Sequence, residues 1–258
     1  MEHGDHLTDV TGGALGRRTR RAGRGVGRAQ LVLGLLCSVL ALGAACSRAE
    51  SDPPAERSAA SSPADAPAPA DAAPRIVFLG DSLTAGLGVA AAEAYPAVVQ
   101  QRVRDAGLPH EVVNAGVSGD TSAGGLRRLD WSLKGRVEVL VVAIGANDGL
   151  RGLAPRDLEA NLATIIERAQ ARGTAVLLAG MEAPPNFGAS YTSQFRAVYP
   201  AVAKRYEVPL LPFLLAGVAG VPSLNQADGI HPNPQGHRII ADLMWGQLKP
   251  LLTSRHTE

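Results

Sequence analysis

The chain has 258 residues, 46% of them hydrophobic, and its formal net charge is only +1, a composition typical of a folded globular protein of one or two domains. The basic character lies in the first 45 residues, so the remainder lacks the positive face by which proteins bind nucleic acid. The only cysteines are Cys37 and Cys46, which excludes a disulfide framework, a cysteine metal site and a cysteine nucleophile from everything after residue 46.

Residues 1–45 have the pattern of a secretory signal peptide. An Arg-rich start leads into the uncharged apolar run 31–45, which is short for a transmembrane helix. The run ends in Leu-Gly-Ala-Ala-Cys, which resembles a bacterial lipobox and makes Cys46 a candidate lipidation site. Cleavage by an ordinary signal peptidase and an uncleaved anchor helix are the alternatives. We expect an exported protein, either periplasmic or a lipoprotein tethered to the membrane through Cys46.

Residues 46–74 are dominated by Ala, Pro, Ser and Asp. This composition cannot bury a hydrophobic core and predicts a partly extended linker. The linker would separate the signal segment from a folded domain that begins near residue 75.

Residues 75–253 alternate between strand-like and helical patterns. Apolar strand-like runs lie at 76–79, 111–114, 137–144, 175–179 and 208–212, and helical patterns are clearest at 155–172, 190–206 and 234–252. Continuous apolar strands separated by helices indicate a parallel sheet covered on both faces. The predicted fold class is α/β, a three-layer α/β/α sandwich with a five-stranded parallel sheet, followed by a short tail at 254–258.

Polar or glycine-rich stretches directly follow three of these strands: Gly-Asp-Ser-Leu-Thr at 80–84, a Gly-, Ser- and Asp-containing stretch at 114–122, and Gly-Ala-Asn-Asp-Gly-Leu-Arg-Gly at 145–152. In a parallel sheet, ligands bind beyond the carboxyl ends of the strands. Ser82 in the first stretch is therefore a candidate nucleophile. The alternative is a plain turn in which Asp81 or Ser82 caps the next helix.

A serine nucleophile needs a base, and four histidines follow residue 46. His231 stands in a loop before the last helix with Asp228 three residues earlier, so Asp228 could orient His231 while His231 takes the Ser82 proton. The pair alone is equally compatible with an ordinary turn. Among the other three, His110 is expected to open an edge strand, His237 to lie on an exposed helix face and His256 to lie in the tail.

Attack on an ester also requires donors for the developing oxyanion. Gly119 can bring its backbone N–H close because no side chain intervenes, and Asn147 can supply side-chain donors. The backbone N–H of Ser82 would be the third donor. Taken singly, Gly119 could be a turn glycine and Asn147 a helix cap.

Together, the blocks G-D-S-L (80–83), S-G-D-T-S (118–122), G-A-N-D (145–148) and D-G-I-H-P (228–232) resemble, in order and spacing, the GDSL or SGNH hydrolase family. The stretches N-D-G-L-R-G and V-P-L-L-P-F are similar to its branch of bacterial periplasmic multifunctional acyl-CoA thioesterases, lysophospholipases and arylesterases. The resemblance runs from about residue 75 to residue 252. Thr84 stands where the G-x-S-x-G elbow of α/β-hydrolases has its second glycine, so that geometry is not expected.

The resemblance implies a flavodoxin-like fold, a Ser82, Asp228 and His231 triad, and an oxyanion hole made by Ser82, Gly119 and Asn147. It also implies that Asp81, Leu150 and Leu153 lie at the substrate-binding site. No metal and no organic cofactor is expected.

We therefore expect a serine esterase that hydrolyses carboxylic acyl esters and thioesters through an acyl-serine intermediate, acting as a monomer on small-molecule substrates and not on nucleic acid. A carbohydrate O-deacetylase or an acyltransferase on the same scaffold is the alternative. A non-catalytic, surface-tethered binding module is a further alternative, which predicts the loss of at least one catalytic residue.

Overall fold

The strands form a single parallel sheet in the order β2-β1-β3-β4-β5. A computed structural model of the chain describes residues 73–254; the expected signal segment, Cys46, nearly all of the linker and His256 lie outside this range. The strand order is that of flavodoxin-like doubly wound folds, in which the switch point of the sheet lies between the neighbouring strands β1 and β3. This topology confirms the predicted fold class.

The strands are β1 (Arg75–Gly80), β2 (Glu111–Gly116), β3 (Val137–Ala143), β4 (Ala175–Ala179) and β5 (Leu210–Leu211). The longer helices are α2 (Tyr95–Asp105), α6 (Pro155–Gln170), α7 (Ala189–Arg205) and α8 (Pro234–Ser254). Short helices are α1 (Ser82–Ala85), α3 (Ser122–Arg127), α4 (Leu129–Ser132) and α5 (Ala146–Leu150), with single 3-10 turns η2 (Ala91–Glu93), η3 (Pro185–Phe187) and η4 (Pro222–Leu224).

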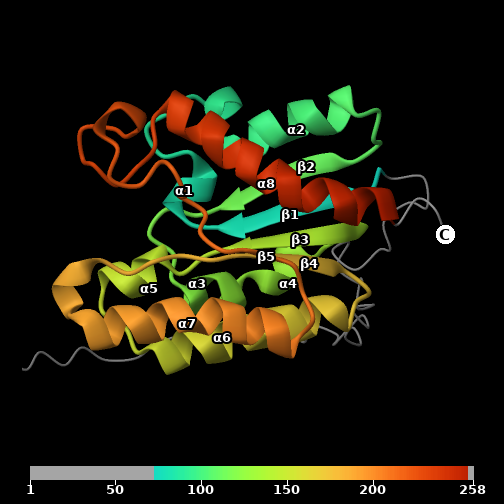
Figure 1. The fold of residues 1–258 in the computed structure, drawn as a ribbon. Helices are drawn as coiled ribbons and strands as arrows, with labels where there is room; N and C mark the ends of the chain where they lie inside the picture. The colour runs from blue at the N-terminus through green and yellow to red at the C-terminus, as the bar shows by residue number, and fades with distance from the viewer. Residues whose placement is uncertain (1–72, 255–258) are drawn as a thin grey trace, which may run out of the picture. The chain divides into compact units, whose positions relative to one another are not determined.

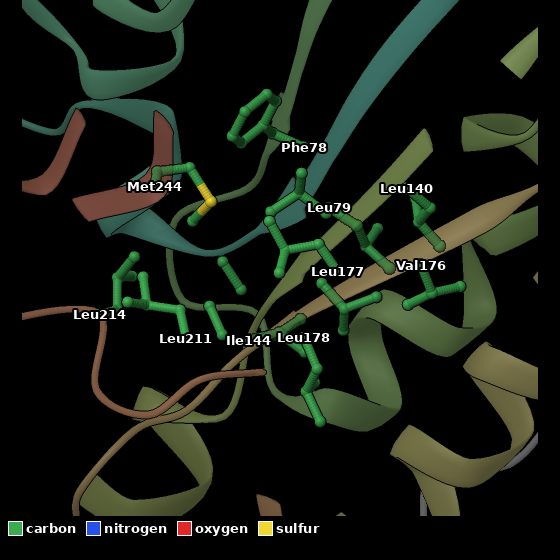
Figure 2. Close-up of a cluster of buried hydrophobic side chains, with 14 of the residues drawn as sticks. Phe78, Leu79, Leu140, Ile144, Val176, Leu177, Leu178, Leu211, Leu214 and Met244 are labelled. Atoms are coloured by element: carbon green, nitrogen blue, oxygen red, sulfur yellow. The ribbon is translucent and has the colours of Figure 1, made fainter. Parts of the chain in front are cut away.

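Helices cover both faces of the sheet. Figure 1 shows α2 and α8 on one face and α3, α4, α6 and α7 on the other. Residues 76–79 of β1 and 139–143 of β3 are almost completely buried, as expected for central strands packed on both sides. Figure 2 shows part of this core, in which side chains of β1, β3, β4 and β5 gather with Met244 of α8. Within residues 73–254, no helix is both long enough and apolar enough to cross a membrane.

The fifth strand is shorter than its apolar pattern indicates. The run 208–212 predicts five residues, but only Leu210 and Leu211 pair with β4. Pro209 and Pro212 flank this pair, and proline has no N–H to donate to a strand ladder. The pairing is therefore confined to the two residues between the prolines.

The register brings the ends of three strands level with one another. Gly80 of β1 pairs with Gly116 of β2 on one side and with Ala143 of β3 on the other. The polar stretches at the ends of these strands therefore lie at the same edge of the sheet, next to the switch point between β1 and β3. This is the edge at which ligands bind in such sheets.

Candidate active site

Ser82 is the first residue of α1 and follows β1 through a tight turn. The Asp81 carboxylate caps the helix by accepting a hydrogen bond from the Leu83 N–H at 3.1 Å. A Cβ on Gly80 would lie only 2.0 Å from the Thr84 hydroxyl oxygen and 2.7 Å from the Ala143 carbonyl oxygen, so this position accepts only glycine. The turn holds the largely buried Ser82 side chain at the carboxyl end of the central strand.

The structure brings Ser82, His231 and Asp228 into one hydrogen-bonded relay. Ser82 Oγ lies 2.9 Å from His231 Nε2, and His231 Nδ1 lies 2.7 Å from Asp228 Oδ2. The other carboxylate oxygen of Asp228 accepts the backbone N–H groups of Ile230 and His231, each at 3.0 Å. The His231 ring and these two N–H groups lower the pKa of Asp228 to about 2, so this carboxylate is ionised at neutral pH.

Two of the three expected oxyanion donors line a cavity, and the third does not. Ser82 and Asn147 line the cavity, whereas Gly119 does not. Gly119 has a positive φ of 83°, and its carbonyl accepts Arg151 Nη2 at 2.8 Å. Asn147 Nδ2 donates to the Asp120 carbonyl at 2.9 Å, which ties the Asn147 side chain to the Gly119 loop. Within the part of the chain that the structure describes, neither the Ser82 nor the Gly119 N–H has an acceptor.

The cavity next to Ser82 has a volume of about 480 Å³ and a largely apolar wall. Ser82, Asn147 and His231 are among the residues that line it, and Glu182 is the one acidic residue in its lining. Its apolar lining comprises Leu83, Ala146, Leu150, Met181, Ala183, Pro184, Phe213, Leu215, Ala219 and Ile230. Its shape and polarity suit an apolar group attached to a reacting carbonyl.

Comparison with known proteins places these features in a family. Residues 78–239, more than half of the chain, match the GDSL-like lipase/acylhydrolase family. The chain belongs to this family. Membership confirms the resemblance and makes the chain an ester hydrolase.

Similar proteins include several named esterases. Esterase TesA of Pseudomonas aeruginosa is 45% identical over 182 residues, which cover 70% of this chain and 90% of that protein. Thioesterase 1/protease 1/lysophospholipase L1 of Escherichia coli K12 is 42% identical over 184 residues, 71% of this chain and 87% of that protein. A solved structure of esterase EstA from Pseudoalteromonas sp., inhibited by monoethylphosphonate, is 31% identical, covers 69% of this chain and 98% of its own, and has a TM-score of 0.65.

Of the three residues assigned to substrate binding in this GDSL-like hydrolase, only Leu150 lines the cavity. Leu153 lies outside the cavity lining, and its carbonyl accepts the Tyr191 hydroxyl at 2.8 Å. The assignment of Asp81 is wrong, because Asp81 is completely buried and its carboxylate caps α1. Ile230, beside His231, is a lining residue that the sequence did not indicate.

The loop that carries His231 is held by Gln226. The backbone N–H of Gln226 donates to the His231 carbonyl at 2.8 Å. Its side-chain Nε2 donates to the Pro232 carbonyl at 2.9 Å and to the Leu87 carbonyl, beyond α1, at 2.7 Å. Gln226 thus joins the His231 loop to the segment after Ser82. No local pattern indicates this role, because Leu87 is far away in the sequence.

Asp148, next to Asn147, anchors α5 to the neighbouring helices. Its buried carboxylate accepts the Ser122 backbone N–H at 2.7 Å and the Ser122 hydroxyl at 2.5 Å. Asn161 of α6 donates to the same hydroxyl oxygen at 2.9 Å. The segment bearing Asn147 is therefore fixed from two sides.

The prediction for His237 is wrong. His237 is 1% exposed, and its Nδ1 accepts the Tyr95 N–H at the start of α2, at 3.3 Å. The packing of α2 against α8 buries this face of α8, and burial lowers the pKa of His237 to about 4. His110 precedes the edge strand β2, as expected, and its Nε2 lies 3.0 Å from Glu138 Oε2. Within residues 73–254, no cluster of His, Cys, Asp and Glu could hold a metal ion.

Proposed function

We propose that this chain is a serine esterase in which Ser82 attacks acyl esters and thioesters, with His231 as base and Asp228 as its orienting carboxylate. The observation that carries the proposal is the continuous relay from Ser82 Oγ to His231 Nε2 and from His231 Nδ1 to Asp228, in which Ser82 and His231 line a largely apolar cavity. The names of the similar proteins, which include an esterase and a thioesterase, support this substrate class.

In the first half-reaction, Ser82 Oγ bonds to the carbonyl carbon while its proton moves to His231 Nε2. The ionised Asp228 stabilises the resulting imidazolium through Nδ1. The carbonyl oxygen becomes an oxyanion, which accepts hydrogen bonds from the N–H groups of Ser82 and Gly119 and from the side-chain amide of Asn147. Each such donor contributes about 3–4 kcal/mol to lowering the barrier.

Collapse of this intermediate breaks the bond to the alcohol or thiol, which leaves with the proton from His231. In the second half-reaction, His231 takes a proton from water, and the hydroxide oxygen bonds to the acyl carbon. Breakdown releases the carboxylic acid and returns the proton to Ser82. The apolar cavity would hold the acyl group in both halves.

The decisive experiment compares the full chain with its Ser82→Ala variant on aryl esters of increasing acyl length, acyl-CoA and a lysophospholipid. We expect turnover that the variant loses, stoichiometric labelling of the wild type by a fluorophosphonate, and no labelling of the variant. Equal activity of the two proteins would refute the mechanism. Transfer of the acyl group to a sugar hydroxyl in place of water, or activity confined to acetylated sugars, would favour the acyltransferase or O-deacetylase alternative.

We further propose that residues 1–45 direct export and that residues 46–74 tether the domain through a lipid on Cys46. The lipobox-like end of the apolar run supports this proposal. In a bacterial host, Cys46→Ser should release the enzyme from the membrane fraction, and the mass of the wild-type N-terminal peptide should include acyl chains. An unmodified N-terminus after Ala45 would support the ordinary signal peptide instead.

A further inference from the structure

Arg128, between α3 and α4, uses its guanidinium to join two backbone carbonyls and one side-chain carboxylate from separate segments of the chain. Nε donates to Asp120 Oδ2 at 2.6 Å, Nη1 to the Ala115 carbonyl at 2.6 Å and Nη2 to the Gly80 carbonyl at 2.7 Å. The side chain is only 18% exposed and does not line the cavity. Arg128 is therefore placed to hold structure and not to touch a substrate.

Two of the three acceptors of Arg128 lie close in the chain to proposed oxyanion donors. Gly80 ends β1 two residues before Ser82, and Asp120 follows Gly119 directly. The Asp120 carbonyl in turn accepts Asn147 Nδ2 at 2.9 Å. Arg128 thus contacts the segments that carry Ser82 and Gly119 directly, and it is linked to Asn147 through Asp120.

The Asp120 carboxylate packs closely against α3. A Cβ on Gly124 would lie 2.4 Å from Asp120 Oδ1, so the carboxylate packs directly against the α3 backbone. The planar guanidinium presents donors in three fixed directions, which a lysine ammonium on a flexible stem cannot reproduce. Arginine is accordingly the one side chain suited to this junction.

We propose that Arg128 is a positioning residue for the oxyanion hole: by binding Gly80, Ala115 and Asp120 together, it fixes the donors of Ser82, Gly119 and Asn147 relative to one another. This role rests on the proposed function of those donors. A fault in their alignment raises the energy of the transition state more than that of bound substrate, so the effect belongs in kcat and not in KM.

The test uses the full chain with Arg128→Gln and Arg128→Lys, and Arg127→Gln as the matched control, since Arg127 is the adjacent, exposed arginine. For both Arg128 variants we expect kcat on an aryl ester to fall about 10–100-fold, within the effect of losing one oxyanion donor, and KM to change less than about threefold. Affinity for an alkyl boronic acid, which forms a tetrahedral adduct with serine, should fall by a similar factor. Arg127→Gln should match the wild type in all three measurements.

A second measurement separates positioning from general loss of structure. Guanidinium ion at millimolar concentration should restore at least a tenth of wild-type kcat to Arg128→Ala, and should leave Arg127→Ala unchanged. Folded Arg128 variants with wild-type kcat and boronate affinity would overturn the proposal. A fall in kcat together with an equally large rise in KM, without rescue by guanidinium, would overturn it as well. If instead the wild type itself has no esterase activity that depends on Ser82, the proposed function fails and this role fails with it.

Discussion

Asp81 stands one residue before the candidate nucleophile with its carboxyl group completely buried. Oδ1 accepts the Leu83 N–H, whereas Oδ2 has no hydrogen-bond partner within residues 73–254. Burial raises the pKa of Asp81 to about 6, and the Leu83 N–H opposes the shift only in part. The pKa of Asp81 is therefore higher in the folded chain than in the unfolded chain. Its contribution to the free energy of unfolding is fully present below about pH 4 and is lost as the pH rises through about 6.

Asp81→Asn should therefore stabilise the fold at neutral pH. Asparagine keeps an acceptor for the Leu83 N–H and removes the buried charge, so we expect the free energy of unfolding at pH 7 to rise by up to about 3 kcal/mol. The gain should shrink towards zero at pH 4, where the wild-type carboxyl group is already protonated when folded. Urea unfolding at both pH values measures this, with the exposed Asp105→Asn as control. A variant less stable than the wild type at pH 7 would contradict the argument.

The contribution of His237 to stability should depend on pH in the opposite direction to that of Asp81. Burial lowers its pKa to about 4, although the charge of Glu93 opposes the shift, so the unfolded chain binds more protons between pH 4 and 6.5. Its stability contribution is present above pH 6.5 and is lost as the pH falls to 4, by at most about 3 kcal/mol. His237→Gln, which keeps an acceptor for the Tyr95 N–H, should lose less stability than the wild type between pH 7 and pH 4. Equal losses, measured by urea unfolding, would show that His237 does not titrate in this way.

Asp81 and His237 also show which properties of a single residue could not be predicted from the sequence. Ser82, Asp228 and His231 stand in short local blocks, and the structure brings them together as those blocks predict. The burial of Asp81 and His237 depends on elements far away in the chain, such as the packing of α2 against α8. A polar residue on an amphipathic helix is therefore expected at the surface until its distant partner is known.

Among the elements, long helices and central strands follow from the pattern, and short elements do not. Helix α6 begins at Pro155 and ends near Gly173 as the sequence predicts, because proline at the first turn and glycine after the last are strong signals. Helices α3 and α4 have six and four residues, too few for a hydrophobic period to show. Their stability comes from tertiary contacts, among them the bonds of Arg128.

In the His231 loop, the Gln226 side chain adds to the bonds that Asp228 makes within the loop by joining the loop to the segment after α1. Gln226→Ala removes the bonds to the Leu87 and Pro232 carbonyls, which together contribute about 1–3 kcal/mol, while the backbone bond to His231 remains. We expect kcat/KM to fall about tenfold because His231 loses its fixed distance to Ser82. Steady-state kinetics with an aryl ester measures this, and the exposed Gln235→Ala is the control. Unchanged kcat/KM in Gln226→Ala would show that the loop holds His231 without this link.

At the scale of the whole domain, the proposed catalytic groups and the cavity come from segments brought together only by the sheet topology. The donors follow β1, β2 and β3, whereas the apolar wall is completed by residues after β4 and β5, such as Met181 and Phe213. The strand order predicts the position of such a site but not its lining, because the loops after β4 and β5 have no pattern that fixes their conformation. We therefore expect the acyl-chain preference of the proposed esterase to depend on those loops.

Ala219 is a suitable position at which to alter that preference, because it lines the cavity and is exposed. A larger side chain there does not have to displace the core. The Ala219→Phe side chain should occupy cavity volume that a long acyl chain needs. We therefore expect kcat/KM for long-chain aryl esters to fall about tenfold, as for the loss of one to two buried methylene contacts. The kcat/KM for acetyl esters should change less than twofold, because an acetyl group is too short to reach the part of the cavity that the new side chain fills. Ala197→Phe, exposed on α7 outside the cavity lining, controls for added surface hydrophobicity. Equal losses for short and long chains would mean that the acyl group binds elsewhere, since only occupation of the cavity makes the effect depend on chain length.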